Sequence, residues 1–257
     1  MNRSWAAILV AGLMGIGLLS ACASDTATTS AATTTEITVF AASSLKGPFT
    51  QLADTFQQQH PGVIVRLNVA GSTDLLAQLG QGAPADVFAP ADLPTMKRAE
   101  ADDLVAAPIR RYASNTMSVA VPPDNPAGIK GFADLAASDV TVVVCAPVVP
   151  CGAATQRVEQ RSGITLTPAS EESAVADVLA KVASGEADAG VVYVTDVTAA
   201  DGAVTGVPIA ASSNAVNVYS IAVAADSGQA ALADEFVALV TGSTGREVMA
   251  DAGFAEA

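Results

Sequence analysis

The sequence predicts an α/β fold with two lobes, and three observations lead to this prediction. Short apolar or β-branched stretches alternate along the chain with stretches whose apolar residues recur at helical spacing. Such alternation is typical of mainly parallel sheets with helices on both faces. The segment of globular composition, 36–257, is long for one core and comfortable for two. Two of its expected strands lie where the chain would cross between lobes.

The first half of this segment gives strands and helices in turn. Ile37 to Ala41 form the first expected strand, and Phe49, Leu52 and Phe56 then fall on one face of a helix. The His-Pro-Gly sequence at 60–62 ends that helix. The elements expected next are a strand at 63–69, a helix from Ser72, a short strand within 85–90, a helix at 91–104 capped by Asp92, and a strand at 115–122.

The second half repeats the alternation. It is expected to contain a buried strand at 139–147, a helix at 152–163 closed by Gly163, a helix at 171–185 closed by Gly185, strands at 187–194 and 214–225, and two final helices. The strands at 115–122 and 214–225 are the expected crossings. One lobe is therefore predicted at 36–116 plus 220–257, and the other at 117–219.

Residues 1–21 are predicted to be a lipoprotein signal peptide rather than part of the fold. Arg3 is their only charge, and an apolar run over 5–19 follows it. The next residues, Leu-Ser-Ala-Cys, resemble the bacterial lipobox, which implies cleavage before Cys22 and a diacylglyceryl anchor on its thiol. A transmembrane helix is the alternative, but the apolar run is short for one. Residues 22–35 are rich in Thr, Ser and Ala and are predicted to be a flexible tether.

The composition argues against a nucleic-acid-binding surface. The chain carries 26 acidic and 12 basic residues, a formal net charge of −14, and its Lys and Arg residues are scattered. Net charge governs solubility and long-range steering rather than a local site, so an acidic chain can still bind an anion.

Two cysteines remain for the fold if a lipid takes Cys22. Cys145 and Cys151 lie six positions apart, and exported proteins meet an oxidising environment in which a close pair usually forms a disulfide. A redox-active pair is the alternative, although the spacing is not that of a C-x-x-C motif. No metal site is expected, because His60 is the only histidine.

Candidate binding groups follow the expected strands, because ligands of open α/β sheets sit beyond the carboxyl ends of the strands. Hydroxyl-bearing and small residues that also begin helices occupy these positions: Ser43-Ser44, Gly71-Ser72-Thr73, Cys151-Gly152, and Tyr193 with Thr195 and Asp196. Helix N-termini offer unpaired N–H groups and a positive dipole end, and small residues let an anion approach closely. The pattern indicates an oxyanion held by neutral groups, although serines at such positions are commonly helix caps only.

An enzymatic site has weaker support from the residues. Ser44 as a nucleophile would need a base, and His60 lies at a helix end. Lys46 and Lys181 could serve as bases in principle, but neither stands in an S-x-x-K pattern. Asp86 and Asp92 could pair as carboxylates, but their positions favour turn and capping roles. No P-loop is present in the sequence.

Five stretches resemble, in the right order, the periplasmic molybdate-binding proteins of ABC transporters. They are ITVFAASSL (37–45), AGSTDLLAQL (70–79), GAPADVFAPAD (82–92), VPCGAA (149–154) and GVVY (190–193). The resemblance implies the two-lobed class II periplasmic binding protein fold, with a hinge of two crossing strands and no enzymatic activity. It implies a lipid-anchored monomer on the extracytoplasmic face of the membrane. Such a protein captures molybdate or tungstate between its lobes, without a cofactor, and delivers it to an ABC permease.

The resemblance also implies five ligand contacts. They are the hydroxyls of Ser44, Ser72 and Tyr193 and the backbone N–H groups of Cys151 and Val175. Cys151 replaces a small apolar residue usual at its position, but a backbone donor does not depend on the side chain. A bridge from Cys145 to Cys151 would stiffen the loop that presents this N–H group and lower the ordering cost of binding.

A site made only of donors favours a fully deprotonated tetrahedral anion. A protonated phosphate would leave an O–H group without an acceptor, at a cost on the order of 1–3 kcal/mol. Molybdate, tungstate and sulfate all satisfy this condition, and only pocket size separates sulfate from the other two. Three hypotheses are therefore carried forward: a molybdate receptor, a receptor for sulfate or another anion, and a serine hydrolase that uses Ser44.

Overall fold

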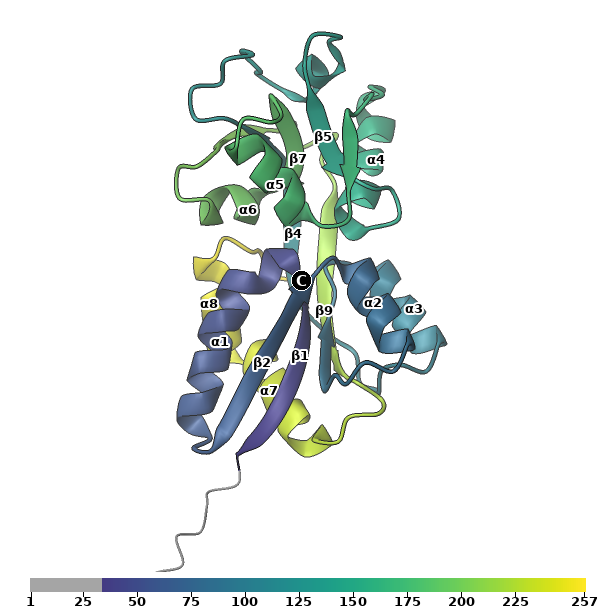
Figure 1. The fold of residues 1–257 in the computed structure, drawn as a ribbon, viewed down its shortest axis with the longest axis vertical. Coiled ribbons are helices and arrows are strands. Elements are labelled where there is room, and N and C mark those ends of the chain that lie inside the picture. The colour runs from purple at the N-terminus through teal and green to yellow at the C-terminus, as the bar shows by residue number, and fades with distance from the viewer. Residues whose placement is uncertain (1–33) are drawn as a thin grey trace, which may run out of the picture. The chain divides into compact units, whose positions relative to one another are not determined.

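Two groups of strands and helices are joined by two long strands in the computed structural model, which describes residues 34–257 (Figure 1). We call the group that contains β1 lobe 1 and the group that contains β5 lobe 2. The predicted signal peptide, the expected lipidation site Cys22 and nearly all of the predicted tether lie outside the described residues. Strand β1 begins at Thr35, two residues earlier than expected.

Lobe 1 is built around three strands of the N-terminal half. Its elements are β1 (Thr35–Ala42), a 3-10 turn (Ser43–Leu45), α1 (Lys46–Gln59), β2 (Val63–Ala70), α2 (Ser72–Gly80), β3 (Val87–Ala89), α3 (Leu93–Ala101), α7 (Ala230–Thr241) and α8 (Ser243–Asp251). Strand β1 pairs in parallel with β2 and β3, so the carboxyl ends of these strands meet at the edge that faces lobe 2.

Lobe 2 is formed by the middle of the chain. Its elements are a 3-10 turn (Phe132–Ala136), β5 (Val142–Cys145), α4 (Pro150–Ser162), β6 (Ser170–Glu172), α5 (Val175–Ala183), β7 (Ala189–Tyr193), α6 (Val194–Ala199) and β8 (Thr205–Pro208). Strand β5 pairs in parallel with β6 and β7.

Strands β4 (Arg110–Val121) and β9 (Val216–Val223) run between the lobes and pair with each other in antiparallel register. The upper part of β4 continues into lobe 2, where it pairs with β7 and β8, while β9 continues into lobe 1 beside β3. The strand order is therefore β2-β1-β3-β9-β4-β7-β5-β6, with β8 also beside β4. These two strands are the predicted hinge crossings, and β4 begins five residues earlier than expected.

The hydrophobic core is divided between the lobes. One cluster of buried residues extends from Met117 to Ala215 and fills lobe 2. Two clusters fill lobe 1 on the two faces of its sheet, one around Phe49 and Phe236 and the other around Phe88. Core residues change from lobe 1 to lobe 2 between Ala113 and Met117, and they change back between Ala215 and Tyr219. The expected lobe ranges, 36–116 plus 220–257 and 117–219, stay a proposal, and Tyr219 itself packs with lobe 1.

The two-lobed α/β prediction is confirmed, with differences in detail. Four strand pairings are parallel and four are antiparallel, because β4 and β9 run against their neighbours. The expected helix at 171–185 was wrong at its start: residues 170–172 pair with β5 as β6, and α5 begins at Val175. The apolar period continues only from Val175, so the polar residues before it were free to form an edge strand.

No helix within residues 34–257 combines the length and the apolar composition that a membrane crossing needs. In the same range, no group of three or more His, Cys, Asp or Glu side chains is placed to hold a metal ion.

Candidate functional site

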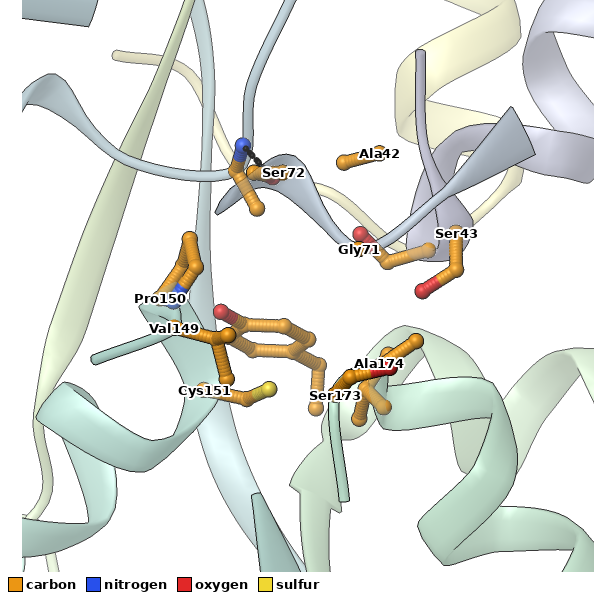
Figure 2. A pocket seen from close by; sticks show the side chains of 13 residues that line it. Ala42, Ser43, Gly71, Ser72, Val149, Pro150, Cys151, Ser173 and Ala174 are labelled. Atoms are coloured by element: carbon orange, nitrogen blue, oxygen red, sulfur yellow. Dashed lines mark hydrogen bonds between the residues drawn. The ribbon is translucent and has the colours of Figure 1, made fainter. Parts of the chain in front are cut away.

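A small cavity lies between the two lobes at the hinge. The space inside it, counted together with the open solvent at its mouth, is about 230 Å³. Figure 2 shows Ala42, Ser43, Gly71 and Ser72 on the lobe 1 side, facing residues 149–151 and 173–174 of lobe 2. The remaining lining residues are Ser44, Ala91, Val175 and Tyr193. None of the lining residues carries a formal charge.

Four helical N-termini meet at this cavity. Lobe 1 contributes the 3-10 turn that leads into α1, together with α2, and lobe 2 contributes α4 and α5. Their N-cap residues are Ala42, Gly71, Val149 and Ala174, and none of these four helical starts has a side-chain cap. By contrast, α3 starts just after the lining residue Ala91 and is capped, because the carboxylate of Asp92 accepts a hydrogen bond from Thr95 N at 3.0 Å. The missing caps leave N–H groups and positive dipole ends directed at the cavity.

The start of α4 is fixed by three neighbouring residues. Pro150 occupies the first helical position, where its locked φ suits a helix and no N–H is lost. Cys151 forms a disulfide with Cys145, as predicted. A Cβ atom on Gly152 would lie 1.9 Å from Ala146 O, so only glycine allows the loop to fold back this closely. No described backbone group accepts a hydrogen bond from the N–H of Cys151 or of Val175.

Two hydroxyl groups of the cavity are held as hydrogen-bond acceptors by the protein. Ser72 Oγ accepts a bond from Ala91 N at 3.0 Å, and Tyr193 Oη accepts one from Asn217 Nδ2 at 2.7 Å. Each oxygen then keeps its own O–H proton for another acceptor. Ser44 Oγ lies 3.0 Å from Tyr219 Oη, and either group can be the donor of that bond.

The tyrosine hydroxyls stay protonated in this environment. Burial raises the pKa of Tyr193 well above its ordinary value, and neighbouring Tyr219, Asp92 and Asp196 raise it further. Burial likewise raises the pKa of Tyr219. Both groups therefore remain O–H donors at any physiological pH.

Asp196 lies beside the site and is also perturbed. Burial raises its pKa to about 7, partly offset by the hydrogen bond from Tyr193 N to its carboxylate at 2.9 Å. Its carboxylate supports the backbone of Tyr193 at the start of α6 and does not line the cavity.

The lobes touch each other beside the cavity. A Cβ atom added to Gly71 in lobe 1 would lie only 2.2 Å from Ser173 O in lobe 2. Thr73 Oγ1 donates a hydrogen bond across the gap to Val148 O at 3.1 Å. The described arrangement is therefore a closed one, in which the groups of both lobes face a shared space.

All five residues expected to contact the ligand, Ser44, Ser72, Cys151, Val175 and Tyr193, line this one cavity. Their contact with a ligand stays a prediction. The carboxylates of Asp86 and Asp92 have structural roles instead, since Asp86 accepts bonds from Thr38 N and Ser227 Oγ. His60 lies at the far end of α1, about 20 Å along the helix from Ser44, too far to act as its base.

Sequence reasoning missed the partners that orient the site. Asn217 and Tyr219 hold the hydroxyls of Tyr193 and Ser44, respectively. The alternation along β9 was the available indication. Asn217 lies on the same face of the strand as Tyr219 and Ile221, and that face points into the interior.

Comparison with known proteins identifies the family. A family model described as bacterial extracellular solute-binding protein matches residues 37–255. The chain belongs to this family. A bacterial extracellular solute-binding protein acts outside the cytoplasm by binding rather than catalysis, so the serine hydrolase hypothesis is wrong.

The relatives of this solute-binding protein include proteins named for one anion. The molybdate-binding protein ModA of Mycobacterium tuberculosis is 46% identical over 250 residues, which cover 97% of this chain and 95% of the relative. The resemblance drawn from the five sequence stretches is thereby confirmed.

Solved structures share the fold. The periplasmic molybdate-binding protein of Azotobacter vinelandii matches with a TM-score of 0.71 and 22% identity, covering 85% of this chain and 98% of that one. The sulfate-binding protein SubI of Mycobacterium tuberculosis matches with a TM-score of 0.75 and 17% identity, covering 86% of each chain. Identities this low show the two-lobed fold alone and do not distinguish the anions.

Proposed function

We propose that this solute-binding protein captures molybdate, and tungstate with it, in the cavity between its lobes. One observation carries the proposal: several uncapped helical N-termini and five hydroxyl-bearing residues surround a small cavity that has no charged lining residue. Helix N-termini bind anions without a formal counter-charge. The name of the relative at 46% identity supports molybdate as the anion.

Five groups supply the proposed contacts. Ser44 and Ser72 donate from lobe 1, and Tyr193 together with the N–H groups of Cys151 and Val175 donates from lobe 2. Because these donors belong to both lobes, a bound anion stabilises the closed form relative to an open one. The disulfide at Cys151 reduces the freedom of its loop before binding and so lowers the ordering cost.

The donor set also explains which anions are rejected. No lining side chain is a carboxylate that could accept a proton from the ligand. A fully deprotonated dianion satisfies every donor, whereas a protonated phosphate brings a donor of its own. Sulfate is the remaining competitor, and the size of the closed cavity decides between it and the larger molybdate.

The proposal extends to the place of action. A lipid on Cys22 and the tether over 22–35 hold the protein at the extracytoplasmic face of the membrane, where the closed monomer delivers its anion to an ABC permease. Mass spectrometry of the exported protein tests the anchor, because a mature chain that begins elsewhere or lacks the added lipid contradicts it.

Calorimetric unfolding of residues 34–257 with molybdate, tungstate, sulfate and phosphate tests the ligand. A ligand that binds only the folded state stabilises it by about 2.7 kcal/mol at a hundred times its dissociation constant. We expect a large rise in Tm with molybdate and tungstate and little with the other two. An equal rise with sulfate, or no rise with any of the four, contradicts the proposal.

A further inference from the structure

We propose that Asn217, oriented by Arg157, is the positioning residue that makes Tyr193 a hydrogen-bond donor to the anion and so excludes anions that carry a proton. This inference rests on the proposed function of the cavity. Asn217 does not itself line the cavity, but by this inference it determines whether the hydroxyl of Tyr193 donates a hydrogen bond to a ligand or accepts one.

Asn217 is the link between the hinge and two parts of the site. It lies on β9 with its side chain buried, 2% exposed. Its Nδ2 donates to Tyr193 Oη at 2.7 Å and to Pro150 O at 3.2 Å. Through these two bonds it holds both the tyrosine hydroxyl and the first residue of α4, which precedes the N–H group of Cys151.

Arg157 fixes which way the amide of Asn217 points. Its guanidinium donates to Asn217 Oδ1, and a guanidinium has donors only. The oxygen of the amide must therefore face Arg157, and the NH₂ group must face Tyr193 and Pro150. Arg157 lies on α4 itself, so the helix that presents Cys151 also sets the orientation of Asn217.

The orientation of Asn217 determines the direction of the tyrosine proton. Tyr193 Oη accepts the bond from Asn217, and the neighbouring hydroxyl of Tyr219 is itself engaged with Ser44 Oγ. The raised pKa keeps the hydroxyl protonated. Its O–H is thus left for an acceptor in the cavity that Tyr193 lines. An anion oxygen without a proton is such an acceptor, and an oxygen that carries a proton is not.

Strand β4, which pairs with β9, carries a similar buried asparagine that bonds to a different hydroxyl. Asn115 lies directly across from Asn217 in the β4–β9 register and is also buried. Its Nδ2 donates to Thr195 Oγ1 at 2.7 Å, near the start of α6. Of these two asparagines, only Asn217 bonds to a hydroxyl that lines the cavity, so the selectivity is assigned to Asn217 and not to Asn115.

The test compares molybdate with hydrogen phosphate in the variant Asn217→Asp at about pH 8. A carboxylate only accepts, so the Tyr193 proton turns toward the introduced group and its oxygen faces the cavity as an acceptor. Both ligands are dianions at this pH, so the added negative charge repels them alike and cancels in the ratio of their dissociation constants. We expect this ratio to change by at least about tenfold in favour of hydrogen phosphate.

Asn214→Asp is the matched control. It adds the same charge just before β9, but the amide of Asn214 bonds only to backbone groups, those of Met117 and Ala215, and touches no hydroxyl of the cavity. The ratio should stay at its wild-type value in this control. Arg157→Met is the second variant, because it frees the amide of Asn217 to rotate without placing a carboxylate beside Tyr193. It should shift the ratio in the same direction by a smaller factor.

The outcomes separate this inference from the proposed function. If wild type binds molybdate and the ratio is unchanged in both Asn217→Asp and Arg157→Met, the role of Asn217 is overturned and the proposed function stands. If Asn217→Asp does not fold, as judged by calorimetry, the ratio in Arg157→Met decides in the same way. If wild type binds neither anion, the proposed function fails and the inference fails with it.

Discussion

At the scale of single residues, hydrogen bonds from the protein determine where hydroxyls of the cavity can direct their protons. Ser72 and Tyr193 each accept one bond from the protein, so each has an O–H group left over. The backbone N–H groups at the helix starts are donors by nature. The chemistry offered to a ligand therefore depends on hydrogen-bond partners that mostly lie behind the lining residues.

Replacement of Ser72 by alanine should weaken molybdate binding while leaving the fold intact. The variant loses one charge-assisted hydrogen bond, worth about 1.5–3 kcal/mol, which corresponds to a rise in the dissociation constant of roughly 10- to 100-fold. Ala91 N loses its acceptor as well, so a fall in unfolding free energy of about 1 kcal/mol is expected. Isothermal titration measures the first effect and calorimetry the second.

Ser243→Ala is the matched control, because Ser243 begins α8 just as Ser72 begins α2 but does not line the cavity. It should bind molybdate as wild type does. A Ser72→Ala protein with wild-type affinity would remove Ser72 from the site.

Asp196 should make stability depend on pH. Its pKa is about 7 in the folded protein and about 3.9 in an unfolded chain, so the folded state holds the extra proton between these values. The free energy of unfolding therefore falls as pH rises from about 4 to about 7, by up to about 1.4 kcal/mol per pH unit. Asp196→Asn keeps an acceptor for Tyr193 N and should show a smaller fall.

Urea unfolding at about pH 5 and about pH 7.5 measures this dependence in both proteins. An equal fall in wild type and Asp196→Asn would show that other groups cause it.

At the scale of elements, the start of α4 combines a proline, a disulfide and a glycine in three consecutive residues. Pro150 sets the helix start, Cys151 ties it to the end of β5, and Gly152 allows the loop to pass within contact of the helix. The same short loop receives the bond from Thr73 of lobe 1 at Val148. This loop is thus both part of the candidate site and part of the contact between lobes.

Removal of the disulfide by the double substitution Cys145→Ala and Cys151→Ala should cost about 2 kcal/mol of stability, as expected for so short a closed loop. The dissociation constant for molybdate should rise as well, because the loop must then be ordered on binding. Wild type treated with a dithiol reductant should change in the same way under the same assay. Unchanged affinity in both samples would show that the bridge serves stability alone.

At the scale of the whole molecule, the two lobes approach each other closely beside the cavity that both of them line. Gly71 marks the closest approach, because a Cβ atom there would collide with Ser173 O. The backbone of Gly71 itself, with φ of −60°, is one that alanine adopts freely. Closure, rather than local conformation, therefore requires glycine at this position.

Gly71→Ala should fold normally but close poorly. We expect molybdate affinity to fall by at least tenfold and the decrease in radius of gyration on adding molybdate, measured by small-angle X-ray scattering, to shrink or vanish. Gly47→Ala on α1 is the control, because nothing lies within 4 Å of its added Cβ. A Gly71→Ala protein that compacts and binds like wild type would show that the lobes accommodate the methyl group.

The strands and helices whose apolar residues recur at a regular spacing were predictable from the sequence. The positions where small and hydroxyl-bearing residues follow strands were predictable as well. The β1–α1 and β2–α2 joins were found because apolar spacing changes abruptly at Ser43 and Ser72. Strand β6 was missed because its three polar residues have no apolar pattern and are held only by pairing with β5. The short strand β8 was missed for the same kind of reason, since it depends on β4 beside it.

Three features could be predicted from the residues alone: the two-lobed α/β class, a bridge between Cys145 and Cys151, and a set of donors suited to an anion. These follow from period, spacing and side-chain chemistry, which are local properties. Folding brings Asn217 to Tyr193 and Gly71 to Ser173, and it gathers several uncapped helix starts at one cavity. Those relations join residues tens of positions apart, and the packing of two lobes about β4 and β9 creates them.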